Sequence, residues 1–407
     1  MVLSSPSETD ARLQQFRQQF PALVNKRYFN FGGQGPLPQC ALDALQQAQL
    51  KIQREGPFSG AVNQWLQQAG TEMRQALANV LQVPGDTMTL TESVTVGCNI
   101  PLWGIDWRPG DRILLTDCEH PGIVATVQEI SRRFQVAVDV CSVLATAQEG
   151  DPVAAIAAAL QPRTRLLVVS HILWNTGQVL PLADIVRLCH DHTPDPAWVL
   201  VDAAQSVGMM PLSLSDTEVD FYAFTGHKWC CGPAGLGGLY VRPEMRQAIA
   251  PTFIGWRSIT TDAHANPTGW QPTGQRYEVA TSDYPLMAGL QAALSLHQTW
   301  GSSGDRYQRI CTLGRQLWQQ LATHPRIRMI CAEPPESGLV SFEILDSTET
   351  PSRECHVRLV KDLEADGMML RTLLDPHCVR ACVHYLTLEA EVGELSDRIF
   401  RWIQNNG

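Results

Sequence analysis

Lys228 stands among residues that would make a lysine chemically reactive. The apolar and aromatic run from Phe221 to Phe224 precedes it, and Trp229 follows it. A lysine with aromatic neighbours loses hydration, which lowers its pKa and makes it a better imine former and a better base. The alternative is that its ammonium group reaches solvent past these neighbours. The glycine-rich run 232–238 that follows indicates tight turns, and it is weak evidence by itself.

A carboxylate ends a second apolar segment. Asp202 follows Trp-Val-Leu-Val at 198–201. A carboxylate at the end of a buried strand needs a hydrogen-bonding partner or a cation. The alternative is that Asp202 caps a helix beginning at Ala203, and this explains the residue at least as well when it is considered alone.

Hydroxyl groups precede a third segment, which has helical character. Thr91-Glu92-Ser93 comes before a stretch that contains Gly97 and Asn99. Hydroxyls and free backbone N–H groups at a helix start suit a phosphate. An ordinary helix cap is the better interpretation of this motif alone. Together with Lys228, Asp202 and the planar ring of His120, however, such a cradle is what pyridoxal phosphate requires.

The elements that must position these residues alternate between strands and helices. Apolar strands are expected at 112–116, 135–143, 165–170, 198–202 and 220–225, and helices at 121–134, 151–160 and 182–189. Nearly all-apolar strands between helices predict an α/β fold whose parallel sheet is covered on both faces. Such sheets bind ligands beyond the carboxyl ends of their strands. The loops around His120, at 171–175, at 202–205 and at 225–228 are therefore the candidate site.

Length and pattern predict two domains. The 407 residues exceed one compact core. Leu13, Phe16 and Phe20 have helical spacing, which predicts an N-terminal arm over residues 1–25 that packs on the small domain. We expect a large domain over 26–283. After it, a helix at 285–296 leads into mixed short strands and helices, which predict a smaller α+β domain over 284–407.

Composition excludes several classes of partner. The net charge is −10 and there is no Lys/Arg cluster, so nucleic acid is not expected as a ligand. No apolar run reaches the ~18–20 residues of a membrane helix, and the polar start lacks the pattern of a signal peptide. We therefore expect a cytoplasmic protein. The 12 cysteines are scattered, which is typical of reduced thiols rather than a disulfide framework.

One cluster invites a metal interpretation. Cys189-His190-Asp191-His192 contains ligand-type side chains. It falls at the expected end of a helix, where histidines interact favourably with the helix dipole, and no second Cys/His pair completes a tetrahedral site. We expect a solvated helix end and no metal.

Two motifs identify a family. Val201-Asp-Ala-Ala-Gln-Ser206 and Thr225-Gly-His-Lys228, at their relative spacing, resemble the class V aminotransferase-like family of pyridoxal phosphate enzymes of fold type I. The chain is similar to its cysteine desulfurase and selenocysteine lyase branch and, within that branch, to the cyanobacterial type of cysteine/cystine carbon–sulfur lyase. The resemblance extends from Tyr28 to Tyr385. It implies a large domain with a mostly parallel seven-stranded sheet between helices, and a smaller C-terminal α+β domain.

The resemblance assigns cofactor roles. Lys228 should form the Schiff base and act as the base, Asp202 should pair with the pyridinium nitrogen, and His120, in Cys118-Glu-His-Pro-Gly122, should stack on the ring and take part in catalysis. Gln205 should bind the ring oxygen, and Asn175 should lie near that oxygen and the substrate carboxylate. The implied phosphate contacts are Thr91, Thr225, His227 and, from a neighbouring subunit, Thr281. The last of these implies a homodimer with shared sites.

Substrate contacts are implied as well. Arg371 and Arg380 match the two arginines near the substrate carboxylate, which a guanidinium fork can bind in bidentate fashion. For each of them the alternative is a surface ion pair. Gly33 lies in a matching glycine-rich segment near the substrate. Trp256 stands where relatives have a glycine-rich loop, so it either shapes the substrate pocket or packs at the dimer interface.

The chain departs from the desulfurase pattern after Arg371. Desulfurases have a mobile loop there that carries the cysteine accepting sulfur as a persulfide. Here only eight residues separate Arg371 from Arg380, and Cys378 lies two residues before Arg380. The short segment predicts that Cys378 cannot reach a substrate sulfur.

We therefore expect a carbon–sulfur lyase that eliminates a persulfide from L-cystine, or sulfide from L-cysteine, leaving pyruvate and ammonia. The released sulfur would serve an iron–sulfur acceptor protein. The alternatives are a cysteine desulfurase or selenocysteine lyase that forms alanine, an aminotransferase, and a scaffold without turnover. The combination of Lys228, Asp202 and Arg380 argues against the scaffold.

Overall fold

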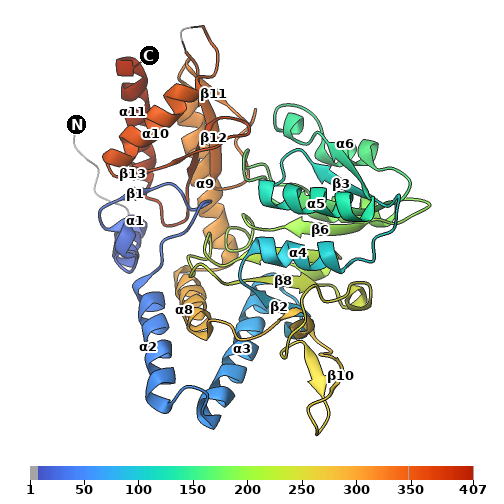
Figure 1. The fold of residues 1–407 in the computed structure, drawn as a ribbon. Coiled ribbons are helices and arrows are strands. Elements are labelled where there is room, and N and C mark those ends of the chain that lie inside the picture. The colour runs from blue at the N-terminus through green and yellow to red at the C-terminus, as the bar shows by residue number, and fades with distance from the viewer. Residues whose placement is uncertain (1–7, 347, 407) are drawn as a thin grey trace.

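The computed structural model describes residues 8–346 and 348–406, and Figure 1 shows their arrangement. A seven-stranded sheet lies at the centre of the larger part. Its strands, in spatial order, are β2 (Met88–Thr91), β8 (Gly237–Val241), β7 (Phe221–Thr225), β6 (Trp198–Asp202), β5 (Thr164–Ser170), β3 (Arg112–Thr116) and β4 (Ala137–Cys141). The five strands from β7 to β4 are parallel, whereas β8 is antiparallel to both of its neighbours.

The central strands are apolar because both faces of the sheet are covered. Successive residues of β5 alternate between two hydrophobic cores: Leu167 and Val169 lie in one, and Leu166 and Val168 lie in the other. β6 alternates in the same way. This two-residue period places one core on each side of the sheet. The predicted α/β fold with a mostly parallel seven-stranded sheet is confirmed.

Helices from different parts of the chain cover the two faces. On one side lie α4 (Val94–Gly104) and α5 (Pro121–Phe134), which Figure 1 shows over the sheet. The other core receives side chains of α3 (Gly60–Leu81), α6 (Pro152–Ala159), α7 (Leu182–His190) and α8 (Tyr284–Trp300). α2 (Gln39–Glu55) packs along α8. The predicted bounds of β3 and α5 agree with the structure to the residue.

The smaller part is built on an antiparallel sheet. Its strand order is β11 (Ile327–Met329), β12 (Leu339–Ile344), β15 (Val379–Cys382) and β14 (Arg371–Thr372). Its helices are α9 (Ser303–Leu321), α10 (Arg353–Ala365) and α11 (Glu389–Asn406). The boundary at residue 284 stays a prediction. α8 begins there, and its Met287 and Leu290 lie in the core of the large sheet.

The N-terminal arm contacts the smaller part. α1 (Glu8–Arg17) ends before Phe20, because the residue that precedes a proline disfavours helical backbone. Leu13 and Phe20 are fully buried, and Arg17 forms an ion pair with Glu391 of α11 at 2.6 Å. Residues 1–7 of the predicted arm lie outside the described residues. β1 (Arg27–Tyr28) then pairs with β13 (Met368–Met369).

β9 (Ile259–Thr261) and β10 (Pro267–Trp270) form a hairpin that projects from the large sheet (Figure 1). None of the helices in the described part of the chain is long and apolar enough to cross a membrane.

Candidate active site

A cavity of about 280 Å³ opens beyond the carboxyl ends of β5, β6 and β7. The predicted site residues that line it are Gly33, His120, Asp202, Gln205, His227, Lys228, Arg371 and Arg380. They come from strand-end loops and from the smaller part, as expected when parallel strands deliver polar residues to one edge. The predicted residues Thr91, Asn175, Thr225, Trp256 and Thr281 are not among its lining.

Two buried histidines contact the backbone that follows Lys228. The Nε2 of His297 contacts the carbonyl of Cys230 at 2.9 Å, and the Nε2 of His384 contacts that of Trp229 at 3.3 Å. These contacts fix the backbone directly after Lys228. Burial lowers the pKa of Lys228 to about 8. Asp202 opposes the shift, and Arg380 and Arg371 add to it.

Asp202 ends β6 and is 6% exposed. Its Oδ1 accepts a hydrogen bond from the N–H of Ala204 at 2.9 Å, but residues 204–206 form a turn, so the alternative in which Asp202 caps a helix beginning at Ala203 is wrong. Within residues 8–346 and 348–406 the carboxylate has no other hydrogen-bonding partner. Burial raises the pKa of Asp202, which the charges of Lys228 and His120 oppose. A buried carboxylate that faces a cavity and has a single hydrogen-bond donor is suited to bind a protonated ring nitrogen.

His120 lies at the mouth of the cavity. It is the N-cap residue of α5, and its Nδ1 accepts a hydrogen bond from the N–H of Gly122 at 3.2 Å. Its ring contacts the ring of Trp174 edge-on, with the centroids 5.9 Å apart. Burial lowers the pKa of His120, which favours the neutral ring. The cap and Trp174 therefore fix the imidazole where a flat cofactor ring could stack on it.

Two residues of this region were missed by the sequence reasoning. Glu119 is 6% exposed and accepts hydrogen bonds from Thr116 Oγ1 at 2.6 Å and from the N–H and Oγ of Ser170 at 2.9 Å each. Burial, with the charge of Asp202 adding to it, raises the pKa of Glu119 to about 7. Glu119 ties the ends of β3 and β5 together beneath His120. The other missed residue is Trp174, and the only signal for either was its nearness in sequence to a predicted residue.

The start of α4 lines the cavity and is the candidate site for an anion. Ser93 caps this helix by accepting a hydrogen bond from the N–H of Val96 at 3.2 Å, and Ser93, Val94 and Thr95 line the cavity. Free N–H groups of a first helical turn bind phosphate. Thr91 Oγ1 donates to the carbonyl of Ser93 at 3.1 Å, so it supports this turn instead of lining the cavity.

Thr225 does not line the cavity but contacts a residue that does. Its Oγ1 lies 2.6 Å from Nδ1 of His227, whose ring lines the cavity. Burial lowers the pKa of His227, and the charge of Lys228 adds to the shift.

Two guanidinium groups, those of Arg371 and Arg380, also line the cavity. Arg380 is 1% exposed, and its Nη1 donates to the carbonyl of Trp174 at 2.6 Å. Its buried Nε has no partner among the described residues. Arg371 is exposed and pairs with Arg380 across β14 and β15. A Cβ at Gly32 would lie 3.0 Å from Sγ of Cys382 and 3.1 Å from Nη2 of Arg380, so a larger residue there would crowd the guanidinium group. The part of the cavity that Arg371 and Arg380 line therefore suits a carboxylate.

Gln205 lines the cavity, whereas Asn175 follows the lining residue Trp174 in the chain. Gln205 donates from Nε2 to the carbonyl of Gly32 at 3.0 Å, and its Oε1 accepts from Trp229 Nε1 at 2.8 Å. Asn175 is 2% exposed and donates to the carbonyl of Asp375 at 3.3 Å. Its Oδ1 is buried without a partner in the described part of the chain. Gln205 retains one N–H for a ligand.

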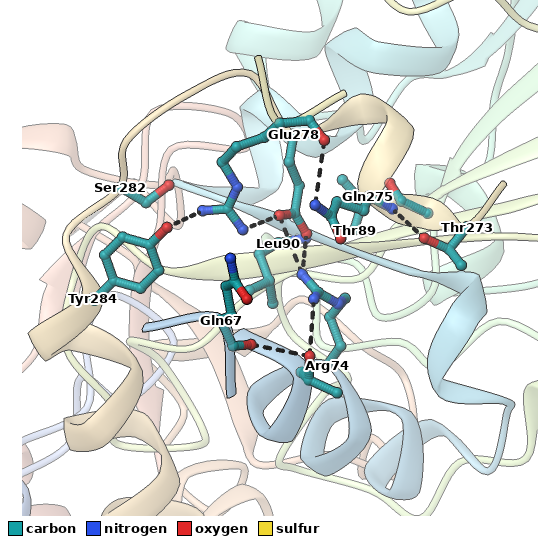
Figure 2. Close-up of polar contacts among 12 residues, drawn as sticks. Gln67, Arg74, Thr89, Leu90, Thr273, Gln275, Glu278, Ser282 and Tyr284 are labelled. Carbon is teal, nitrogen blue, oxygen red and sulfur yellow. Dashed lines mark hydrogen bonds and ion pairs between the residues drawn. The ribbon is translucent and has the colours of Figure 1, made fainter. Parts of the chain in front are cut away.

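Trp256 and Thr281 line a different cavity, of about 510 Å³, together with Arg74, Arg257 and Tyr284. The single chain therefore does not bring them to Lys228. Figure 2 shows the polar network of this region, in which Arg74 points at Glu278 from α3. The assignment of Thr281 to the site of a neighbouring subunit stays a prediction.

Cys378 is fully buried directly before β15, and burial raises the pKa of its thiol to about 12.

The side chains of the cluster at 189–192, which was expected to be a solvated helix end, point to different partners. Cys189 packs in the core, His190 Nε2 contacts Asp220 at 2.9 Å, and His192 contacts the carbonyl of Gln161 at 3.2 Å.

These observations fit pyridoxal phosphate. The under-satisfied carboxylate of Asp202, the helix start at Ser93 and the low-pKa Lys228 surround one cavity, and Arg380 leaves a buried donor free. Asp202 would hold the ring nitrogen, the first turn of α4 would hold the phosphate, and Lys228 would bond covalently to the cofactor.

The fold and the site define a known class: the chain belongs to the aminotransferase class-V family, whose model matches residues 27–393. Its structure is similar to two solved structures of the cystine C–S lyase C-DES, each with 51% sequence identity and a TM-score of 0.90. The similarity covers 94% of this chain, and it covers 98% of one C-DES chain and 99% of the other. One is a lysine-to-alanine mutant with glycine covalently linked to the PLP cofactor. The other contains the reaction product cysteine persulfide.

Curated relatives are more distant. Isopenicillin N epimerase of Streptomyces clavuligerus is 26% identical over 93% of this chain and 94% of its own length. A cysteine desulfurase of Klebsiella pneumoniae is 32% identical over 67% of this chain and 66% of its own length. Because these relatives carry out different reactions, the choice of reaction must come from the site.

Proposed function

We propose that this protein is a pyridoxal phosphate-dependent carbon–sulfur lyase. It cleaves L-cystine, and L-cysteine as a second substrate, into pyruvate, ammonia and a persulfide or sulfide. The observation that carries the proposal is the arrangement of Lys228, Asp202 and Arg380 around one cavity while Cys378 is buried beside it. The similarity to C-DES over 94% of the chain supports it.

Each residue has a task. When bound, the cofactor withdraws electrons from the amino acid and so acidifies its Cα proton. Arg380 and Arg371 hold the substrate carboxylate. Lys228, whose pKa of about 8 leaves a useful neutral fraction near neutral pH, takes the Cα proton. Asp202 would keep the ring nitrogen of the bound cofactor protonated, and His120 would cover its ring.

Elimination balances without a further reactant except water. The Cα proton goes to Lys228, the Cβ–S bond breaks, and its electron pair leaves with the sulfur. Water converts the remaining three-carbon fragment into pyruvate and ammonia. A persulfide is a better leaving group than sulfide because its conjugate acid is stronger, and this favours cystine over cysteine.

The desulfurase alternative requires a mobile thiol. Cys378 is fully buried, and a thiol with a pKa of about 12 is almost entirely protonated at neutral pH. The hydrogen bond from Leu373 N to the carbonyl of Cys378, at 2.8 Å, closes the segment on itself. These features favour elimination over transfer of sulfur to Cys378. None of these features favours a scaffold protein without enzymatic turnover.

We further propose a homodimer that works in the cytoplasm. Phe253, Ile254 and Trp256 are 71%, 61% and 63% exposed, beside the cavity that Thr281 lines. A second copy would cover this apolar surface, and Thr281 would then reach the partner's phosphate. The released persulfide would pass to an iron–sulfur acceptor protein.

Product analysis tests the proposal. Purified protein with pyridoxal phosphate and L-cystine should form pyruvate and ammonia in equal amounts with persulfide, and Lys228→Ala should not. Cys378→Ala should retain the activity of the unsubstituted protein. Alanine with sulfane sulfur, lost in Cys378→Ala, would instead establish desulfurase chemistry.

A further inference from the structure

The segment between the two arginines of the site forms a closed hairpin. Arg371 and Arg380 face each other at its base, and the hydrogen bond between Leu373 N and Cys378 O closes it. Its carbonyl at Asp375 accepts a hydrogen bond from Asn175 at 3.3 Å. The placement of the guanidinium groups therefore depends on what holds the tip of this hairpin.

A pair of histidines holds it. Nδ1 of His377, near the tip, lies 2.9 Å from Nδ1 of His356 on α10. The two rings are nearly parallel, with an interplanar angle of 10° and centroids 5.1 Å apart. His356 is fully buried, whereas His377 is partly exposed. The contact joins the hairpin to a helix of the smaller part.

The hydrogen-bond pattern defines the proton positions. The N–H of Ile344 donates to Nε2 of His356 at 2.8 Å, so Nε2 carries no proton. A neutral His356 then has its proton on Nδ1 and donates it to Nδ1 of His377. His377 must accept, so the contact exists only while Nδ1 of His377 is unprotonated.

Burial favours this neutral pair, and neighbouring charges modify its effect. Burial lowers the pKa of His356 to about 4, and His377 adds to the shift. The pKa of His377 is lowered by burial and by Arg353 of α10, while Glu343 of β12 opposes the shift. Glu343 is itself paired with Arg328 at 2.6 Å. Acidification would put a proton on Nδ1 of His377, and two N–H groups would then face each other.

We propose that His356 and His377 are positioning residues whose hydrogen bond fixes the hairpin and so holds Arg371 and Arg380 at the spacing that binds a substrate carboxylate. Protonation of His377 breaks this hydrogen bond and weakens the binding of the substrate carboxylate by the two arginines. The inference rests on the proposed function for its kinetic consequence. The coupling of the histidine pair to the hairpin backbone does not depend on that function.

Substitutions at His377 provide the test. His377→Ala removes the acceptor, and the KM for L-cystine should rise roughly three- to tenfold at pH 7.5 with kcat within about twofold, as expected when about 1 kcal/mol of binding is lost. His377→Asn restores an acceptor that does not titrate. Its KM at pH 7.5 should stay near that of the unsubstituted protein. Between pH 7.5 and pH 5.5 the KM of the unsubstituted protein should rise, and that of His377→Asn should not.

A second measurement needs no turnover. Amide hydrogen exchange of residues 371–380 should be faster in His377→Ala than in the unsubstituted holoenzyme at pH 7.5, and His377→Asn should restore slow exchange. Unchanged exchange and unchanged KM in His377→Ala would overturn the inference. If exchange is faster in His377→Ala but the unsubstituted protein has no lyase activity, the role of the histidine pair in fixing the hairpin would be supported and the proposed function would be refuted.

Discussion

The carboxylate of Glu278 and the guanidinium of Arg257 form an ion pair at 2.5 Å in which both side chains are almost completely buried. The same carboxylate accepts hydrogen bonds from Arg74 at 2.9 Å and from the N–H of Leu90 at 3.1 Å (Figure 2). Leu90 belongs to the edge strand β2, which leads into the cap of α4. Glu278 therefore joins the Thr281 segment to the strand that precedes the anion-binding turn.

Glu278→Gln should destabilise the protein strongly. The amide keeps an acceptor for Leu90 but leaves two buried guanidinium groups without a carboxylate, a change that costs about 3–5 kcal/mol. Chemical denaturation should show the loss. Glu129→Gln is the matched control, because the Glu129 ion pairs are exposed and screened by solvent, so their loss should change stability little. Equal losses in the two variants would contradict the role of the Glu278 network.

Arg380→Lys should lower kcat/KM for L-cystine more than Arg371→Lys. Arg380 is buried with its Nε free, so loss of its fork removes a desolvated carboxylate contact of roughly 1.5–3 kcal/mol, or about ten- to hundredfold. Arg371 is exposed and its contact is screened, so its loss should cost under about tenfold. Steady-state kinetics of both variants will compare their kcat/KM values. A larger loss in Arg371→Lys would refute the assignment of Arg380 as the main carboxylate contact.

The reactivity of Lys228 in the cofactor-free protein should titrate near pH 8. The neutral amine forms above this pKa, so labelling by an amine-reactive reagent should rise as the pH passes through about 8. Asp202→Asn removes the charge that raises the pKa and should move the midpoint to lower pH, whereas Arg380→Gln should move it to higher pH. Mass spectrometry of the labelled peptide gives the midpoints. If the midpoint moved in the same direction in both variants, the charges of Asp202 and Arg380 would not control the pKa of Lys228.

The free energy of unfolding should decrease as the pH falls from about 6.5 toward 4. Burial lowers the pKa of His297 to about 4, so the unfolded chain binds a proton in this window that the folded protein does not. Each such histidine adds a slope of up to about 1.4 kcal/mol per pH unit. His297→Gln should give a shallower decrease in denaturation curves taken at several pH values. An unaltered slope would mean that His297 is not buried in its neutral form.

Local patterns predicted the elements and part of the site. Apolar runs and turn residues act over a few positions, so they located β3, α5 and the strand ends that carry Asp202 and Lys228. The topology of a parallel sheet then brought those ends to one edge. The helix start at Ser93 was also readable, although the lining role belongs to Ser93 and Thr95 rather than to Thr91.

The sequence by itself determined the fold, the family and the polar residues that converge on one cavity, because periodicity, capping and short motifs are local properties. Only the tertiary structure decided which partners those residues have. Arg74 and Glu278 are 204 residues apart, and His356 meets His377 from another element, so no local pattern could pair them. Burial follows from the same long-range packing, and it sets the pKa of Lys228 and confines Cys378.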